Sequence, residues 1–274
     1  MQVHHINCGT FCPVGGALMD GRSWGLRGQL VCHCLLLETN DGLTLVDTGL
    51  GLRDMQAPFS RLSRLYARML DIQFDEASTA LRQVERAGFG ADDVRHIVLT
   101  HLDFDHAGGL DDFPGARVHL LAAEAETASA RRGFVMQRRY RPQQWGDRSR
   151  WQLYRAQGEP WFGFEAVRGL AGLPPEILLV PLPGHTHGHA GVAVRADGGW
   201  LLLTGDAYFH HDEMGSERHC PPGLRLYQRL MEMDGPLRLR NQERLRRLAC
   251  ERSSELTIIC SHNALELDTT ASSA

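Results

Sequence analysis

The residues best suited to chemistry form a dense run near the middle of the chain, His101-x-Asp103-x-Asp105-His106. Alternate residues of an extended backbone point the same way, so the side chains at 101, 103 and 105 share one side. A turn expected at 107–109 brings His106 toward that side. Neutral imidazoles and carboxylates together are suitable ligands for zinc, iron or manganese. The run therefore predicts a metal site.

Further ligand types stand at three later points of the chain, His185, Asp206 and His262. Each of them follows an apolar run of strand type that breaks into a polar or glycine-containing turn. Because four separate strand ends supply the same ligand chemistry, we expect these residues to converge on one site. Asp47 also follows an apolar strand. It is either a turn-forming aspartate or a residue that holds a ligand in place, and the other motifs favour the second role.

The hydrophobic pattern alternates between short strands and helices. The turn Asn40-Asp41-Gly42 between two apolar runs predicts a β-hairpin. A helical period after Ser60 puts five residues on one face, namely Leu62, Leu65, Tyr66, Met69 and Leu70. Other strands are expected at 97–99, 118–121, 177–182, 192–194, 200–203 and 256–260, and other helices at 77–87, 122–130 and 238–251. The pair 192–194 and 200–203 should turn at Asp197-Gly198-Gly199, and the tail from Asp268 should fray. This order predicts two mixed sheets packed face to face with helices outside.

Composition excludes several classes of function. The 274 residues carry a net charge of −4, and a nucleic-acid partner is therefore not expected. All basic residues are arginines, which excludes a Schiff-base lysine and a P-loop. No apolar stretch is long enough to span a membrane, and the N-terminus has no signal-peptide pattern, so a cytoplasmic protein without a membrane partner is expected. Four cysteines form close pairs in the sequence, Cys8 with Cys12 and Cys32 with Cys34. They are either buried thiols or the ligands of a zinc site.

The segment 131–172 differs from the rest of the chain in its content of arginine and aromatic residues. We interpret residues 1–274 as a single domain in which this segment is an insertion or a lid. Its Trp and Phe residues either form an apolar wall for a substrate or pack as the core of the insertion.

Five motifs together resemble the metallo-β-lactamase superfamily over roughly residues 31–262. The run at 101–106 is similar to its H-x-H-x-D-H loop, and Gly184-His185-Thr186-His187-Gly188-His189 to its G-H-T-x-G-H motif. Asp47, Asp206 and His262 match the remaining motifs. The organisation is most similar to that of the lactonase-like single-domain branch, and the resemblance implies a four-layer αββα sandwich.

The same resemblance implies a centre of two divalent metal ions, with zinc favoured and manganese or iron as alternatives. Its first ion would be held by His101, Asp103 and His185, its second by Asp105, His106 and His262, with Asp206 bridging and Asp47 supporting. The implied enzyme is a metal-dependent hydrolase in which a bridging hydroxide, oriented by Asp105 and Asp206, attacks a small ester, with a lactone favoured.

Several alternatives stay open at this point. The substrate could be a phosphotriester, a thioester or a β-lactam, or the chain could be a di-iron redox protein or a ligand sensor without catalysis. The lactonases have a tyrosine three residues past the bridging aspartate, where this chain has Phe209. Tyr208 is the expected substitute that assists the substrate carbonyl, or else a wall residue. His187 and His189 either line the pocket or are exposed, and a homodimer is one candidate assembly.

Asp103 is the one departure from the family's ligand pattern, because a histidine is usual there. Three aspartates, two divalent ions and one hydroxide sum to a charge of zero, whereas a histidine at 103 would give +1. The extra negative charge should raise the pKa of the bound water above the roughly 7 of catalytic zinc sites, and it should favour harder ions such as manganese or iron.

Overall fold

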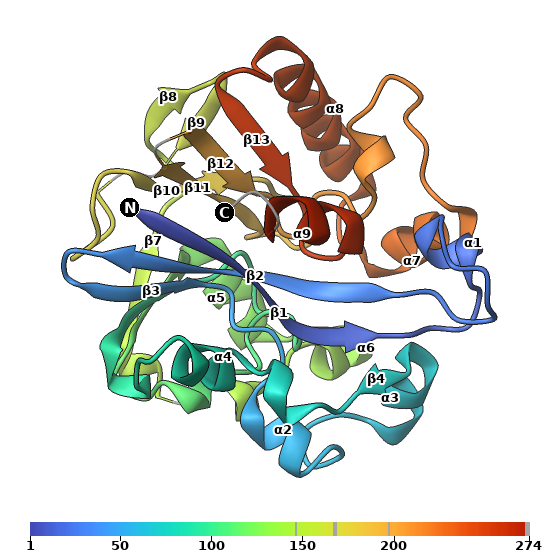
Figure 1. Ribbon diagram of the computed structural model, residues 1–274, viewed down its shortest axis with the longest axis horizontal. Coiled ribbons are helices and arrows are strands. Elements are labelled where there is room, and N and C mark those ends of the chain that lie inside the picture. The colour runs from blue at the N-terminus through green and yellow to red at the C-terminus, as the bar shows by residue number, and fades with distance from the viewer. Residues whose placement is uncertain (146, 167–168, 197, 272–274) are drawn as a thin grey trace.

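Two mixed β-sheets packed face to face form the framework of the computed structural model, which describes residues 1–145, 147–166, 169–196 and 198–271 (Figure 1). The first sheet has the order β4-β1-β2-β3-β5-β6-β7 and the second the order β10-β11-β12-β13. The strands of the first sheet are β1 (Gln2–Phe11), β2 (Leu30–Thr39), β3 (Gly42–Val46), β4 (Ile72–Gln73), β5 (Val94–Val98), β6 (Arg117–Leu121) and β7 (Trp151–Tyr154). Those of the second are β10 (Ile177–Pro181), β11 (Ala190–Ala196), β12 (Gly199–Leu203) and β13 (Leu256–Ile259), and a separate hairpin is made by β8 (Glu159–Trp161) and β9 (Phe164–Ala166).

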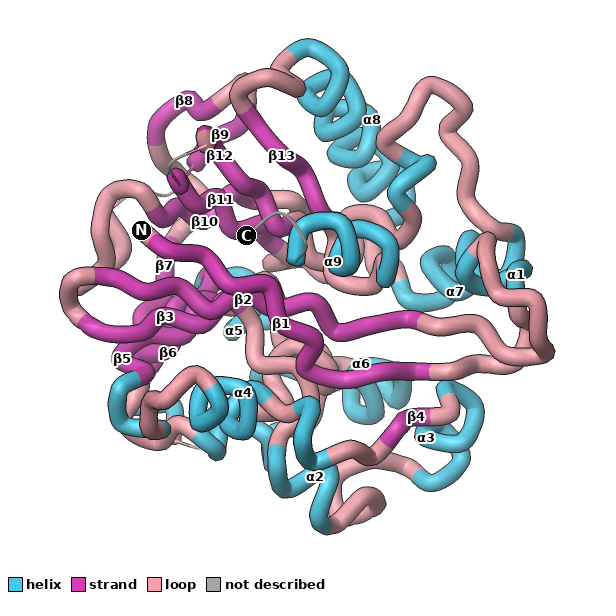
Figure 2. Tube along the Cα trace, in the orientation of Figure 1, coloured by secondary structure: helices cyan, strands magenta, loops and turns pink. Residues whose placement is uncertain are grey.

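Helices flank both sheets and fill the connections between strands (Figure 2). The α-helices are α1 (Ala17–Asp20), α2 (Leu52–Gln56), α3 (Arg64–Leu70), α4 (Ala80–Arg86), α5 (Ala122–Ala130), α6 (Gly133–Arg139), α7 (Pro222–Met231), α8 (Gly235–Glu251) and α9 (Ala264–Ala271). Short 3-10 helices are η1 (Glu76–Ser78), η2 (Ala91–Asp93), η3 (Leu110–Asp112), η4 (Pro142–Gln144), η5 (Arg148–Arg150) and η6 (His211–Glu213). None of the helices in the described ranges has the length and apolar content that crossing a bilayer requires.

Strand direction brings the chemically capable residues to one edge of the sandwich. In the first sheet, β3, β5 and β6 are parallel. In the second, β10 and β12 are both antiparallel to β11, and β13 is parallel to β12. The carboxyl ends of β3 and β5 therefore share one edge, and so do those of β10, β12 and β13. Backbone hydrogen bonds across this edge, from Asp47 N–H to Val98 O and from Ala190 N–H to Thr100 O, hold the loops that follow these strands together.

Three apolar layers separate the four structural layers. Between the sheets, Leu35 and Leu37 of β2 belong to one buried cluster with Leu179 and Val192 of the second sheet. The outer face of the first sheet packs on α4 and α5, and that of the second sheet on α8. Figure 1 shows α4 below the large sheet and α8 above the small one. The prediction of a four-layer αββα sandwich is confirmed.

Sequence periodicity missed some elements and misassigned one apolar face. The pattern did not predict β1, α7 or α9, and α9 includes much of the tail that was expected to fray. Residue 197 of the predicted hairpin turn and residues 272–274 lie outside the described residues. On α3, Leu65 and Met69 are exposed although their spacing predicted burial. Both side chains line a cavity, so this face of α3 contacts a pocket and not the core.

Several large aromatic residues of the segment 131–172 pack inside the protein, whereas Phe134 is exposed. Trp145 is fully buried in the cluster beneath the first sheet, and Trp161 and Phe164 belong to the cluster under α8. They are therefore packing residues, and the alternative of a substrate wall built from them is wrong. Within this segment, β7 extends the first sheet, while α6 lies over the edge that carries the site.

We predict that one buried histidine makes stability fall in mild acid. His119 of β6 contacts His96 Nδ1 and the Tyr154 hydroxyl, each at 2.9 Å, and burial with His96 and Arg117 lowers its pKa to about 3. The unfolded chain binds this proton near pH 6.5, so the His119 contribution to stability is lost as pH falls from about 6.5 toward 3. The His119→Gln variant lacks this pH-dependent loss. The difference in free energy of unfolding between the parent and the variant should therefore shrink by up to about 1.4 kcal/mol per pH unit below 6.5.

Urea unfolding at several pH values between about 7 and 5 measures this difference. His219→Gln, at an exposed position, is the matched control and should leave the pH dependence unchanged. A constant difference between parent and His119→Gln across this range would contradict the prediction.

Candidate metal centre

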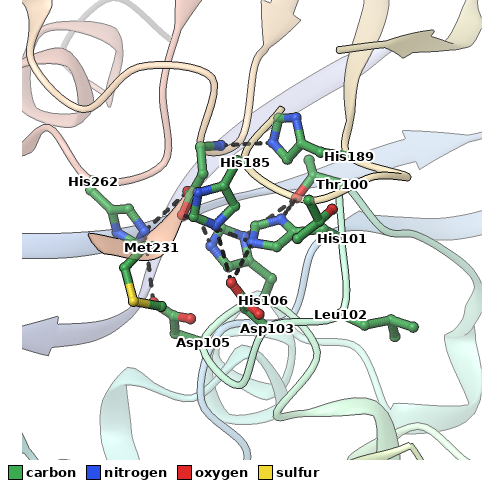
Figure 3. A network of polar contacts seen from close by, with 12 residues as sticks. Thr100, His101, Leu102, Asp103, Asp105, His106, His185, His189, Met231 and His262 are labelled. Carbon is green, nitrogen blue, oxygen red and sulfur yellow. Dashed lines mark hydrogen bonds and ion pairs between the residues drawn. The ribbon is translucent and has the colours of Figure 1, made fainter. Parts of the chain in front are cut away.

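Two groups of buried ligand residues lie side by side at the shared sheet edge (Figure 3). The first group is His101, His185 and Asp206, and the second is Asp105, His106 and His262. Within each group the ligand atoms all lie within 4.8 Å of one another. The structure thus brings six of the predicted metal ligands together from four separate loops.

Asp206 connects the two groups through its two carboxylate oxygens. Its Oδ2 lies 3.2 Å from His185 Nε2 and 3.8 Å from His101 Nε2. Its Oδ1 lies 3.3 Å from His106 Nε2 and 3.1 Å from His262 Nε2. One oxygen therefore faces each group, which is the arrangement that a bridging carboxylate needs.

The histidine rings are oriented by contacts on their outer nitrogens. His106 Nδ1 contacts Asp47 Oδ2 at 2.8 Å, and His262 Nδ1 donates to the carbonyl oxygen of Val31 at 2.7 Å. His101 Nδ1 contacts the Thr100 hydroxyl at 3.0 Å. A proton held on Nδ1 leaves the Nε2 lone pair free for an ion, so the outer contacts select the tautomer that can ligate.

Asp47 supports the centre from behind His106. Its carboxylate also accepts the Thr100 backbone N–H at 2.8 Å and the Thr100 hydroxyl at 2.7 Å, and it is fully buried. Its backbone is left-handed, with φ at 57°, a conformation that costs a non-glycine residue about 1–3 kcal/mol. In this conformation the turn after β3 directs one carboxylate toward both Thr100 and His106.

The donor set fits metal ions of the zinc type. Among the described residues, three buried atoms that face the centre have no hydrogen-bond partner, namely His101 Nε2, His106 Nε2 and Asp206 Oδ1. Unpaired buried polar atoms are costly, and an ion would satisfy all three. Burial lowers the pKa of His101 and of His185, which keeps both imidazoles neutral as ligands. Tetrahedral zinc ligands lie roughly 3.3–3.6 Å apart, close to the distances around Asp206.

Asp103 lies beside the first group but is already paired. Its Oδ2 is 3.3 Å from His101 Nε2 and 3.1 Å from His185 Nε2. Arg139, at the end of α6, donates to both oxygens of Asp103, with Nε to Oδ1 and Nη2 to Oδ2 both at 2.6 Å. Burial alone would raise the pKa of Asp103, but Arg139 and the two imidazoles hold it well below its usual range. The carboxylate is therefore ionised and ion-paired.

This ion pair corrects the charge that the sequence predicted for the centre. Asp103 was counted as an uncompensated negative charge, but the Arg139 guanidinium is always protonated and adds +1. With Arg139 included, the sum for the centre becomes +1, the value that a histidine at position 103 would give. The expected rise in the pKa of bound water therefore loses its electrostatic basis. Arg139 was missed because it lies 36 residues from Asp103 in the sequence.

The structure also corrects the expectation for Tyr208. Its fully buried hydroxyl donates to Glu266 Oε1 of α9 at 2.8 Å, so it neither assists a substrate nor lines the pocket. Phe209 faces the centre instead, with its ring centroid 4.9 Å from that of His262 and 6.1 Å from that of His185.

Two other phenols lie near the centre, and no sequence motif marked them. The hydroxyls of Tyr66 (α3) and Tyr227 (α7) are 3.3 Å apart, and the Tyr227 ring lies 6.0 Å from that of Phe209. Burial and the Asp105 carboxylate raise the pKa of both tyrosines. The Asp103 charge also raises the pKa of Tyr66, and the neighbouring Tyr66 raises that of Tyr227. Both therefore stay protonated and keep a proton to donate.

The two remaining histidines of the 184–189 loop have different positions. His189 is buried, its Nδ1 donates to Leu182 O at 2.9 Å, and its Nε2 accepts the backbone N–H of Asp206 at 2.9 Å. It thus positions Asp206 through that backbone contact. His187 is exposed and lines the pocket.

Glu124 of α5 joins the ligand loops, a role that sequence reasoning did not detect. It is buried and accepts the Leu102 N–H at 3.0 Å, the Thr186 hydroxyl at 2.5 Å and the Tyr140 hydroxyl at 3.2 Å. One carboxylate therefore ties the loop of His101 to the loop of His185.

Ligand clusters elsewhere do not compete with this centre. In the part of the chain that the structure describes, the only further group of ligand residues with this spacing is His210, His211 and Asp212, which is partly exposed. No cysteine belongs to any such group there, and Cys8, Cys32 and Cys34 are buried free thiols. The alternative of a four-cysteine zinc site is therefore not supported.

A mostly apolar cavity of about 860 Å³ opens beside the first group. Asp103 and Arg139 form its inner end, together with Tyr66 and Phe104. Its walls come from α3, α6 and α7 and include Met69, Val135, Met136, Leu230 and Met231. The cavity therefore combines apolar walls with a charged pair, Asp103 and Arg139, that contacts the first group.

Comparison with known proteins gives consistent matches. The sequence profile of the Metallo-beta-lactamase superfamily matches residues 27–219. A protein named "Probable metallo-hydrolase" from Mycobacterium tuberculosis is 40% identical over 263 residues, which cover 96% of this chain and 80% of that protein. The N-acyl homoserine lactonase AiiA of Bacillus thuringiensis subsp. kurstaki is 25% identical over 214 residues, which cover 76% of this chain and 78% of the lactonase.

Solved structures share the fold. An N-acyl homoserine lactone hydrolase with N-hexanoyl-L-homoserine bound at its metal centre matches with a TM-score of 0.70 and 22% identity, over 97% of this chain and 95% of that one. A probable metal-dependent hydrolase from Staphylococcus aureus matches with a TM-score of 0.71 and 18% identity, over 95% and 88% of the two chains.

We predict that Asp47 controls metal affinity without touching the ion. In Asp47→Asn the neutral amide accepts the hydrogen bond from His106 Nδ1 more weakly than the carboxylate does, so metal affinity should fall by about 10–100-fold. Competition with a chromophoric chelator measures this change. Asp41→Asn, in the β2–β3 turn, is the matched control, and equal affinities in the two variants would show that Asp47 has no such role.

Proposed function

This chain belongs to the metallo-beta-lactamase superfamily, and we propose that it is a dinuclear metallohydrolase that opens lactones carrying an apolar acyl chain. The superfamily assignment and the similarity to a metallo-hydrolase support hydrolysis as the reaction class. The observation that supports the substrate is the apolar cavity that reaches Asp103 and Arg139, which contact His101 and His185 of the first group.

His101, His185 and Asp206 would hold one ion, and Asp105, His106 and His262 the other, with Asp206 shared. Divalent ions at these positions supply polarisation of a carbonyl oxygen and a water that is nucleophilic near neutral pH. Asp105 would have a second task besides holding an ion. Burial raises its pKa, and this carboxyl, at 3.7 Å from His262 Nε2, is the group of the centre best placed to accept and return a proton.

The cavity favours a substrate with a flexible apolar tail. Its walls of methionine, leucine and valine side chains adapt to alkyl chains, and burial of each methylene contributes about 0.8 kcal/mol. The ester group would lie at the inner end, among Asp103, Arg139 and Tyr66. Two similar proteins are named for N-acyl homoserine lactones, which have this combination of a polar ring and an apolar chain.

The paired phenols of Tyr66 and Tyr227 would take over the role that lactonases give to a tyrosine at the position of Phe209. Both hydroxyls are protonated, the Asp105 charge acts on both, and Tyr66 lines the cavity, so the pair is the candidate donor to the substrate carbonyl. Phe209 meanwhile shields His185 and His262 from that side.

The expected result with a substrate panel is preference for acylated lactones. With metal-loaded enzyme, kcat/KM should rise by about three- to fourfold per added methylene until the cavity is filled, because 0.8 kcal/mol corresponds to that factor. β-Lactams and phosphotriesters should be poor substrates. His106→Ala, which loses a ligand, should be inactive. The absence of turnover on every lactone and ester, with metals bound, would contradict the proposal and favour a sensor.

Removal of the phenols tests the carbonyl-donor role. The variant with both Tyr66→Phe and Tyr227→Phe should lose about 10–100-fold in kcat with unchanged metal content, because only a hydrogen bond to the reacting carbonyl is removed. Tyr208→Phe, which removes a phenol that points toward α9, is the matched control and should keep kcat per folded molecule. Equal kcat values in both variants would exclude the role of the pair.

A further inference from the structure

Arg139 is buried at the ligand cluster, in contrast to the arginine that precedes it. Its side chain is only 6% exposed, whereas Arg138 is exposed and lies over the Phe134 ring at 4.1 Å. Burial of a guanidinium is costly unless strong partners surround it. A buried cation beside candidate metal ligands therefore needs strong partners of its own.

Three groups hold the Arg139 guanidinium. The two N–H groups on Nε and Nη2 form the fork to the Asp103 carboxylate. A second Nη2 proton points to His185 Nε2 at 2.7 Å, and Nη1 donates to the carbonyl oxygen of Met231 at 2.5 Å. Arg139 thus connects the end of α6, the end of α7 and two residues of the first ligand group.

The contact with His185 has a direct consequence for metal binding. The Nε2 atom of His185 is the atom that this residue offers to the first group, and its single lone pair cannot serve both an N–H donor and an ion. In addition, a fixed positive charge at this position repels a divalent cation. Arg139 and an ion at the first position therefore compete.

The second group has no such competitor. In the described ranges, no arginine forms an ion pair with Asp105, nor with the Asp47 and Asp206 carboxylates that pair with His106 and His262. The two positions share Asp206 but differ in their charged neighbours.

We propose that Arg139 is an internal cation that makes the two metal positions unequal, so that the position of Asp105, His106 and His262 binds an ion tightly and that of His101 and His185 binds weakly. The weak position fills when Arg139 releases His185 and keeps Asp103 alone. This inference rests on the dinuclear centre proposed above. It concerns how the centre is loaded, and it does not depend on which substrate is hydrolysed.

Titration of the full chain, stripped of metal by a chelator, with Zn²⁺ or Co²⁺ tests the proposal. We expect one tight ion and a second ion that binds at least about tenfold more weakly. His185→Ala should lose the weak event alone, and this would assign it to the first position. In Arg139→Gln the second ion should tighten by about tenfold or more, with a second Co²⁺ absorption band appearing at lower metal concentration. Arg138→Gln, the adjacent arginine on the same helix, should behave as the parent.

Asp103→Asn provides the opposite change. It leaves Arg139 without its partner beside His185, so the second ion should bind still more weakly than in the parent. If Arg139→Gln does not fold, as judged by circular dichroism, Arg139→Met keeps the length and apolar stem of the side chain and should give the same tightening. Unchanged or weaker binding of the second ion in the folded Arg139 variant would overturn the proposal, as would equal affinities for both ions in the parent.

The binding titration is separate from the assay of hydrolysis. Unequal loading without lactone turnover would overturn the proposed function and leave this inference in place. Lactone turnover with two equal ions would do the reverse.

Discussion

The carboxylate of Asp206 is the interaction on which the rest of the centre depends. Among the described residues it is the carboxylate that faces both sets of histidines, with one oxygen toward His185 and the other toward His106 and His262. A buried carboxylate is stable there only because these imidazoles surround it and because His189 accepts its backbone N–H. Gly205 makes the turn possible, since its φ is +56° and a Cβ would lie 2.6 Å from His189 Nε2. The sheet topology, Gly205 and His189 thus together fix the position of the Asp206 carboxylate.

Rigidity of the ligand loops comes from buried side-chain acceptors. Glu124 ties Leu102 to Thr186, and Asp47 ties Thr100 to His106. The loop of His185 approaches α5 so closely that a Cβ on Gly188 would lie 2.0 Å from the Glu124 backbone nitrogen. These contacts fix the ligands before an ion arrives, so an ion need not order the loops itself.

The pairing of Asp103 with Arg139 changes the meaning of the departure from the family motif. A histidine is neutral, and the aspartate–arginine pair is neutral as well, so the net charge near the first position is conserved although the residue type is not. The replacement is not equivalent, because the arginine also reaches His185 and belongs to a helix that lines the cavity. Charge balance and substrate access therefore involve the same helix, α6.

The sequence by itself determined the ligand types, their order along the chain and the two-sheet sandwich, because these follow from local patterns: apolar strands, turn residues after them, and His and Asp at the strand ends. Tertiary structure alone decided which other side chains meet the ligands. Arg139, Glu124, Tyr66 and Tyr227 lie on helices, far from the ligands in sequence, and their contacts depend on how those helices pack. It also decided that Phe209 and not Tyr208 faces the centre. The left-handed turn at Gly205 breaks the alternation of the strand before it, so the direction of the side chains that follow cannot be counted from β12.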